Sequence, residues 1–176
     1  HSDTHSFPTR RSSDLFSWNQ AGLGQSRATG FEPTTEFRWL EPDPDPDAEG
    51  PLDATGDPDI AWQCWQESDA RDHLRGLALA PEESWALREL TLADLRDADE
   101  GVIAVASEDG ARAMTARVRD YERETESGDS ERVAEYGVAA WSDLPAAESL
   151  VAAIKRDAAA LGADRTRVLL PETVRY

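Results

Sequence analysis

The order of predicted strands and turns in the second half of the sequence constrains the fold more than any other feature. Residues 101–107 have the apolar composition of a buried strand, and the Asp109-Gly110 pair that follows is typical of a tight hairpin turn. Residues 111–121 and 132–141 are the next two predicted strands, with a polar loop over residues 122–131 between them. We therefore expect an antiparallel meander of three strands.

A long helix and a short buried strand are predicted after the meander. The helix covers residues 144–161, with Asp143 as its N-cap and Gly162 at its C-terminal end. The residues predicted to line its apolar face are Leu150, Val151, Ile154, Ala158 and Leu161. Residues 167–170 form the buried strand, which Pro171 ends. Because a strand–helix–strand crossover joins parallel strands, the sheet should be mixed.

A strand and two helices are predicted before the meander. Residues 60–66 have the composition of a strand, Asp69 can cap a helix that ends near Leu77, and residues 82–95 form a second helix after Pro81. From residue 60 the predicted order is β-α-α-β-β-β-α-β. We therefore predict an α+β fold in which helices flank a mixed, mainly antiparallel sheet.

Charge restricts the partners that this chain can have. The net charge is −18, and Lys155 is the only lysine. A surface this acidic repels phosphate, so nucleic acid and anionic membranes are poor partners. We interpret the charge as adaptation to high salt, because molar salt shortens the range of carboxylate repulsion to about 3 Å.

The cysteine content favours a reducing compartment. Cys64 is the only cysteine, so no intramolecular disulfide can form, and its position between Trp62 and Trp65 indicates a buried, inert thiol. No stretch approaches the roughly 20 apolar residues of a membrane span, and no signal peptide is apparent. We therefore expect a soluble, cytoplasmic protein.

Composition divides the chain into four segments. Residues 1–15 are polar, hold two of the three histidines and resemble a translated sequencing adapter, so we expect this segment to be non-native or disordered. Residues 16–40 form a short block with a strand predicted over residues 35–39. Residues 41–58 are rich in Pro and Asp and predict an extended, self-repelling linker that packs poorly. Residues 59–176 carry the main pattern of strands and helices.

No metal site is predicted. Asp43, Asp45 and Asp47 have the spacing with which a calcium loop begins. However, Ala48 and Ala54 stand where that loop needs a glycine and a bidentate glutamate.

The predicted order from residue 60 resembles the first part of the GNAT (Gcn5-related) N-acetyltransferase fold. The sequence of residues 141–176 is also similar to that of GNAT-like proteins of halophilic archaeal type. The resemblance implies two units in tandem: residues 16–40 would be the C-terminal remnant of a first unit, and residues 59–176 a second unit that lacks its last helix and strands. It further implies acyl transfer from acetyl-CoA to a small-molecule or peptide amine, and it allows a homodimer.

The first unit would contribute one cofactor residue. In this family an Asn begins the fourth helix, a Tyr follows seven residues later, and Gly-Phe follows four residues after that. Asn19, Ser26 and Gly30-Phe31 have this spacing. The resemblance therefore implies that Asn19 is cofactor-binding. Ser26 stands at the position of the tyrosine that protonates the departing thiolate, and a serine hydroxyl is a far poorer acid, so the catalytic residues stay unassigned.

The second unit should bind acetyl-CoA weakly or not at all. The family holds the coenzyme A pyrophosphate at the start of its third helix, where a glycine-rich loop exposes backbone N–H groups. The corresponding residues 141–146 contain no glycine, Asp143 adds a negative charge, and Pro145 lacks an N–H. We therefore expect an ordinary capped helix start and an inactive fragment of the enzyme. The alternative function is a non-catalytic GNAT-like binding or dimerisation module.

Overall fold

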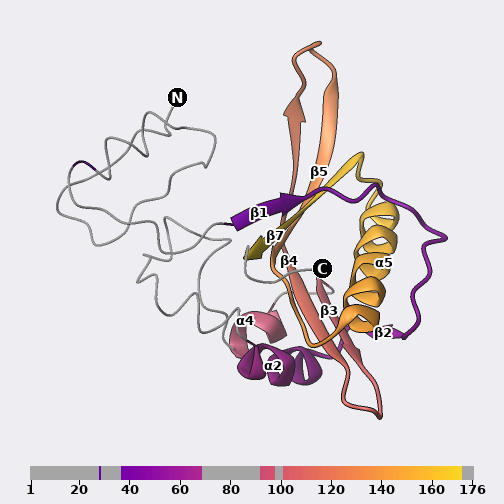
Figure 1. Ribbon diagram of the computed structural model, residues 1–176. Helices are drawn as coiled ribbons and strands as arrows, with labels where there is room; N and C mark the ends of the chain where they lie inside the picture. The colour runs from indigo at the N-terminus through magenta and orange to yellow at the C-terminus, as the bar shows by residue number, and fades with distance from the viewer. Residues whose placement is uncertain (1–27, 29–36, 69–91, 98–100, 172–176) are drawn as a thin grey trace.

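The computed structural model describes residues 28, 37–68, 92–97 and 101–171, which form an α+β fold around one mixed sheet (Figure 1). The described elements are β1 (Phe37–Leu40), β2 (Ala54–Thr55), α2 (Pro58–Glu67), α4 (Leu92–Asp97), β3 (Val102–Ala106), β4 (Arg112–Glu124), β5 (Ser130–Val138), β6 (Ala140–Trp141), α5 (Leu144–Ala160) and β7 (Arg165–Pro171). No described helix is both long and apolar enough to cross a membrane.

The sheet has seven strands. Six of them follow the order β1-β7-β5-β4-β3-β2, and the seventh, β6, pairs with β4 outside this order. The predicted meander β3–β4–β5 is confirmed as antiparallel. Gly110 has a φ of 91° at the turn between β3 and β4, which explains why a glycine follows Asp109 there. The predicted crossover is confirmed too, because α5 joins β5 to β7 and these two strands are parallel.

The hairpin of β4 and β5 is longer than the sequence predicted. The polar loop expected over residues 122–131 is wrong for half of its length, because β4 continues to Glu124 and β5 begins at Ser130, which leaves only residues 125–129 between the strands. Cross-strand pairs such as Arg123 with Glu131, 2.9 Å apart, support this polar part of the ladder. The single strand expected over residues 132–141 is in fact two strands, β5 and β6.

The strand predicted over residues 60–66 is wrong, because these residues belong to helix α2. Asp57 caps this helix by accepting a hydrogen bond from the Asp59 N–H at 2.8 Å, and Pro58 occupies its first turn. Its buried residues have helical spacing and are Ala61, Cys64 and Trp65. The first strand of the predicted order is instead β2, so from β2 onward the described elements keep that order apart from the added β6.

Only part of the two predicted early helices can be compared. The helix expected from Asp69 to Leu77 lies outside the described residues, as do residues 82–91 of the second one. The end of the second helix is present as α4, which continues to Asp97 rather than stopping at Leu95.

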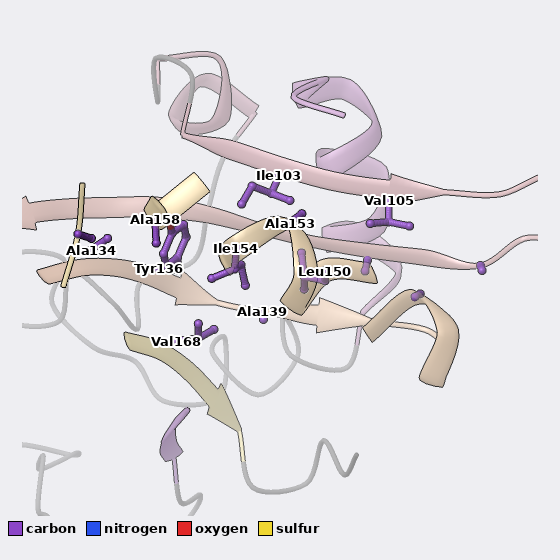
Figure 2. Packing of buried hydrophobic residues seen from close by; sticks show 14 residues of the cluster. Ile103, Val105, Ala134, Tyr136, Ala139, Leu150, Ala153, Ile154, Ala158 and Val168 are labelled. Atoms are coloured by element: carbon purple, nitrogen blue, oxygen red, sulfur yellow. The ribbon is translucent and has the colours of Figure 1, made fainter. Parts of the chain in front are cut away.

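Helix α5 forms the larger core with one face of the sheet. Asp143 is its N-cap, as predicted, and Gly162 follows it with a φ of 69°. Leu150, Ile154 and Ala158 are buried, whereas Val151 and Leu161 are only half-buried. Figure 2 shows the α5 side chains against strands β3, β5 and β7. A second apolar cluster lies under α2 and α4, and its members include Trp65, Leu95, Val102 and Met114.

The segment predicted to be a loose linker packs on the fold. Apart from β2 it has little regular structure, as expected. However, the Asp45 N–H donates to the Lys155 carbonyl at 3.1 Å, and Leu52 packs against the core under α5. The prediction of poor packing is therefore wrong for these residues, because their backbone finds partners on α5. The matching expectation for residues 1–15 lies outside the described residues.

Strand β1 pairs antiparallel with the outer edge of β7. It corresponds to the strand predicted over residues 35–39. This pairing places the end of the 16–40 block in the same sheet as the strands that follow the linker. The division of the chain into two units stays a prediction.

Candidate functional site

The sheet divides where β5 and β7 stop pairing. Their parallel ladder ends at the pair Val138 and Leu169. Beyond it, β6 pairs with β4, whereas the last residues of β7 pair with β1. Among the described residues, no backbone pair joins residues 139–141 to residues 170–171. We call this divergence the strand split; its two arms are β7 with β1, and β6 with β4, β3 and β2.

Two irregularities bend the ladders just before the split. The register of β4 shifts at Val118, and the register of β5 shifts at Gly137. The two residues face each other: a Cβ added to Gly137 would lie 3.1 Å from Val118 Cγ1. The Thr115 hydroxyl donates to the Gly137 carbonyl at 3.2 Å. Such bulges change the direction of a strand, which accounts for the parting of β6 from β7.

The start of α5 follows the β6 arm of the split. Side chains of the residues just before the helix accept hydrogen bonds there from backbone N–H groups. The Asp143 carboxylate accepts a hydrogen bond from the Ala146 N–H at 3.0 Å, and Pro145 has no N–H to offer. The Ser142 hydroxyl accepts from the Arg112 N–H at 2.8 Å. The capped helix start predicted from the sequence is therefore confirmed. The residues present do not fit a pyrophosphate, because an anionic side chain already accepts from the Ala146 N–H and Pro145 has no N–H.

A buried carboxylate lies on β5. The side chain of Glu135 is fully buried and accepts hydrogen bonds from Arg119 Nε at 2.6 Å and from the Tyr121 hydroxyl at 2.7 Å. Arg167 Nη1, on β7, lies 3.2 Å from the same carboxylate. The Arg119 guanidinium also stacks 4.4 Å from the centroid of the Tyr121 ring. Three strands thus contribute to one polar cluster.

The electrostatics of this cluster disfavour proton transfer. Burial raises the pKa of Glu135, but hydrogen bonds from Arg119 and Tyr121 and the charges of Arg119 and Arg167 outweigh it, so its pKa lies below the ordinary 4.5. A general base works best with a pKa near the operating pH. Glu135 is therefore suited to holding β4, β5 and β7 together rather than to accepting a proton.

The polar cluster continues along the same face of the sheet. Glu131 lies 2.9 Å from Arg123 Nε and 2.6 Å from Arg165 Nε, and Arg165 and Arg167 each reach the Glu41 carboxylate. The hydrogen bonds from Arg165 and Arg123 lower the pKa of Glu131. We call Glu41, Arg119, Tyr121, Arg123, Glu131, Glu135, Arg165 and Arg167 the ion-pair face.

A separate polar group lies beneath α5. The Tyr136 hydroxyl donates to Asp157 at 2.5 Å, and Arg117 Nη1 lies 2.7 Å from the same carboxylate oxygen. Burial, followed by the hydrogen bond to Asp157, raises the pKa of Tyr136 well above its ordinary value. Because all three side chains satisfy one another, this group serves to anchor α5 to β4 and β5.

The residues singled out from the sequence do not assemble into one site. Asn19 and Ser26 lie outside the described residues, so the cofactor role of Asn19 stays a prediction. Cys64 is buried as expected, and burial followed by the charge of Glu67 raises its pKa to about 12. In the described part of the chain, no group of His, Cys, Asp or Glu could hold a metal ion.

Glu135 was missed by the sequence reasoning. A signal for it exists, since it is a lone acid between Ala134 and Tyr136 in an otherwise apolar stretch of strand. Alternation alone, however, would place such an acid on a solvated face. Comparisons with family models, with curated proteins and with solved structures found no match to this chain.

Proposed function

We propose that this chain is part of an acetyl-CoA-dependent N-acetyltransferase of the GNAT type. The observation that carries the proposal is the strand split in a parallel pair joined by α5. The resemblance implies a cleft between splayed strands as the meeting place of acyl donor and amine, and in this proposal β5 and β7 are those strands. The reaction class is acyl transfer to a small-molecule or peptide amine in the cytoplasm.

The unit that contains α5 does not hold the cofactor in this proposal. At the start of α5 the Ala146 N–H is taken by Asp143 and Pro145 has no N–H, and the carboxylate of Glu135 is neutralised by two arginines. Cofactor binding then belongs to another part of the protein, and this unit contributes a scaffold or a wall of the substrate site. Without a fitting cofactor site, no catalytic step is assigned to its residues.

A non-catalytic binding or dimerisation module is the second candidate function. The capped start of α5 favours it, since a module that never binds acetyl-CoA needs no open helix terminus there. Both candidate functions give the unit that contains α5 a non-catalytic role. They differ in whether the whole protein transfers an acetyl group.

Calorimetric titration of this chain with acetyl-CoA in molar KCl tests the closed helix start. We expect no binding tighter than about 1 mM, whereas a dissociation constant near 1 μM, about −8 kcal/mol, would show that the start of α5 is open to phosphate. Coenzyme A release in the presence of amines, assayed on the product of the complete gene, separates the two candidates. Amine-dependent release supports the acetyltransferase, and its absence supports the module.

A further inference from the structure

Residues 41–53 connect two strands that lie at opposite ends of the sheet. Strand β1 precedes them and β2 follows them, and the sheet order begins with β1 and ends with β2. The segment therefore passes from one edge of the sheet to the other across the outer side of α5, as Figure 1 shows. We call residues 41–53 the belt.

The belt is attached at three places along its path. At its start, the Glu41 carboxylate lies 3.4 Å from Arg167 Nε, and the Thr166 hydroxyl donates to the Pro42 carbonyl. In its middle, the Asp45 N–H donates to the Lys155 carbonyl at 3.1 Å, and Arg156 Nη1 donates to the Ala48 carbonyl at 2.5 Å. The first attachment is to β7, and the second is to the C-terminal half of α5.

The third attachment lies near the start of α5 and includes a close backbone contact. The Leu52 N–H donates to the Ser149 hydroxyl at 2.9 Å, and Ser149 is itself buried. Gly50 lies so close to the helix that an added Cβ would be 2.5 Å from Ser149 Cα. Because that neighbour is backbone, it cannot rotate away, so only glycine fits here.

These attachments link the belt to both arms of the strand split. Through β1 it is joined to β7 on one arm, and through β2 it is joined to β3 on the other. Thirteen extended residues could span roughly 43–47 Å, so the chain length alone does not fix the distance between the arms. Docking on α5 fixes the path of the belt and so restrains both arms.

We propose that the belt is a conformational restraint that sets the width of the strand split, and that its release from α5 lets the two arms separate. The separation of residues 139–141 from residues 170–171 then depends on the contact of Gly50 and Leu52 with Ser149. This role concerns the fold alone. It therefore does not depend on the proposed acetyltransferase activity.

The test is hydrogen–deuterium exchange of the full chain in molar KCl, read by peptide mass spectrometry. Gly50→Ala breaks the belt contact, and Gly56→Ala is the matched control, since a Cβ there would meet only the Val102 carbonyl at 3.6 Å. In Gly50→Ala we expect amides of residues 139–141 and 168–171 to exchange about fivefold faster or more. Amides of the β3–β4 hairpin, residues 102–116, should exchange as in the parent and in Gly56→Ala.

A second variant decides the matter if Gly50→Ala fails to fold. Ser149→Ala removes the acceptor of the Leu52 N–H without adding atoms, and the same peptides should exchange about twofold to fivefold faster. Faster exchange confined to residues 41–53, with the split unchanged, would overturn the proposal and make the belt a passive covering. Equal acceleration of all peptides, hairpin included, would overturn it as well.

Discussion

The two faces of strand β5 are both buried, but by opposite means. Ala134 and Tyr136 point to α5 and belong to the apolar core shown in Figure 2, whereas Glu135 between them is buried on the ion-pair face. The apolar side is stabilised by removal of hydrocarbon from water, and the charged side only by partners that replace hydration. The first kind of burial should be indifferent to pH, and the second should not.

Glu135→Ala should cause the largest loss of stability. It leaves the charges of Arg119 and Arg167 without their buried partner, so we expect a loss of about 3–5 kcal/mol in the free energy of unfolding. Urea unfolding in 2 M KCl measures it. Glu124→Ala, on the exposed end of β4, is the matched control and should change stability by less than about 0.5 kcal/mol. Equal effects of the two variants would remove the distinction between the faces.

Leu150→Ala should come next, on the apolar side. Leu150 is 2% exposed, and its truncation leaves a cavity under α5, so we expect a loss of about 2–5 kcal/mol. Leu144→Ala on the same helix is the control, because Leu144 is 54% exposed and should cost about 0.5 kcal/mol or less. The same urea titrations compare them. If Leu150→Ala lowered the free energy of unfolding as little as Leu144→Ala does, α5 would not cover this core.

Acid should weaken the ion-pair face selectively. The pKa of Glu135 in the folded protein lies below its ordinary 4.5, so its contribution is present above about pH 4.5 and is lost as the pH falls through the lowered value. Stability measured between pH 6 and pH 3 should therefore fall less steeply in Glu135→Gln than in the parent. Leu150→Ala should keep the parent's slope. Parallel curves for Glu135→Gln and the parent would contradict the lowered pKa.

Salt should have the smallest effect that is still measurable. With a net charge of −18, raising KCl from 0.1 to 3 M screens repulsion between surface carboxylates, and we expect the melting temperature to rise by roughly 5 °C. The loss caused by Leu150→Ala should stay the same at both concentrations. A melting temperature that is flat or falls with salt, followed by circular dichroism, would argue against salt adaptation.

Local signals in the sequence were sufficient where one residue decides the geometry. The Asp109-Gly110 turn, the Asp143 cap and Gly162 at the end of α5 are all found where they were predicted. Each acts through its own backbone or through an amide a few residues away, so no distant part of the chain is needed.

The same kind of signal was overlooked at α2. Ile60, Trp62 and Trp65 favour a strand by propensity, but Asp57 followed by proline is a helix start, and the buried positions have helical spacing. Here the cap and the packing against β3 and β4 outweighed the weak preference of aromatic and β-branched residues for strands.

By itself, the sequence determined the meander, the crossover through α5 and the closed start of that helix, because periodicity, turns and caps are properties of neighbouring residues. Only the tertiary structure decided the burial of Glu135, the strand split and the path of the belt. Glu135 is stabilised by arginines 16 and 32 residues away in the chain, and Leu52 finds its acceptor 97 residues away. Such partners meet only when the sheet is assembled, so the pattern of adjacent residues does not predict these contacts.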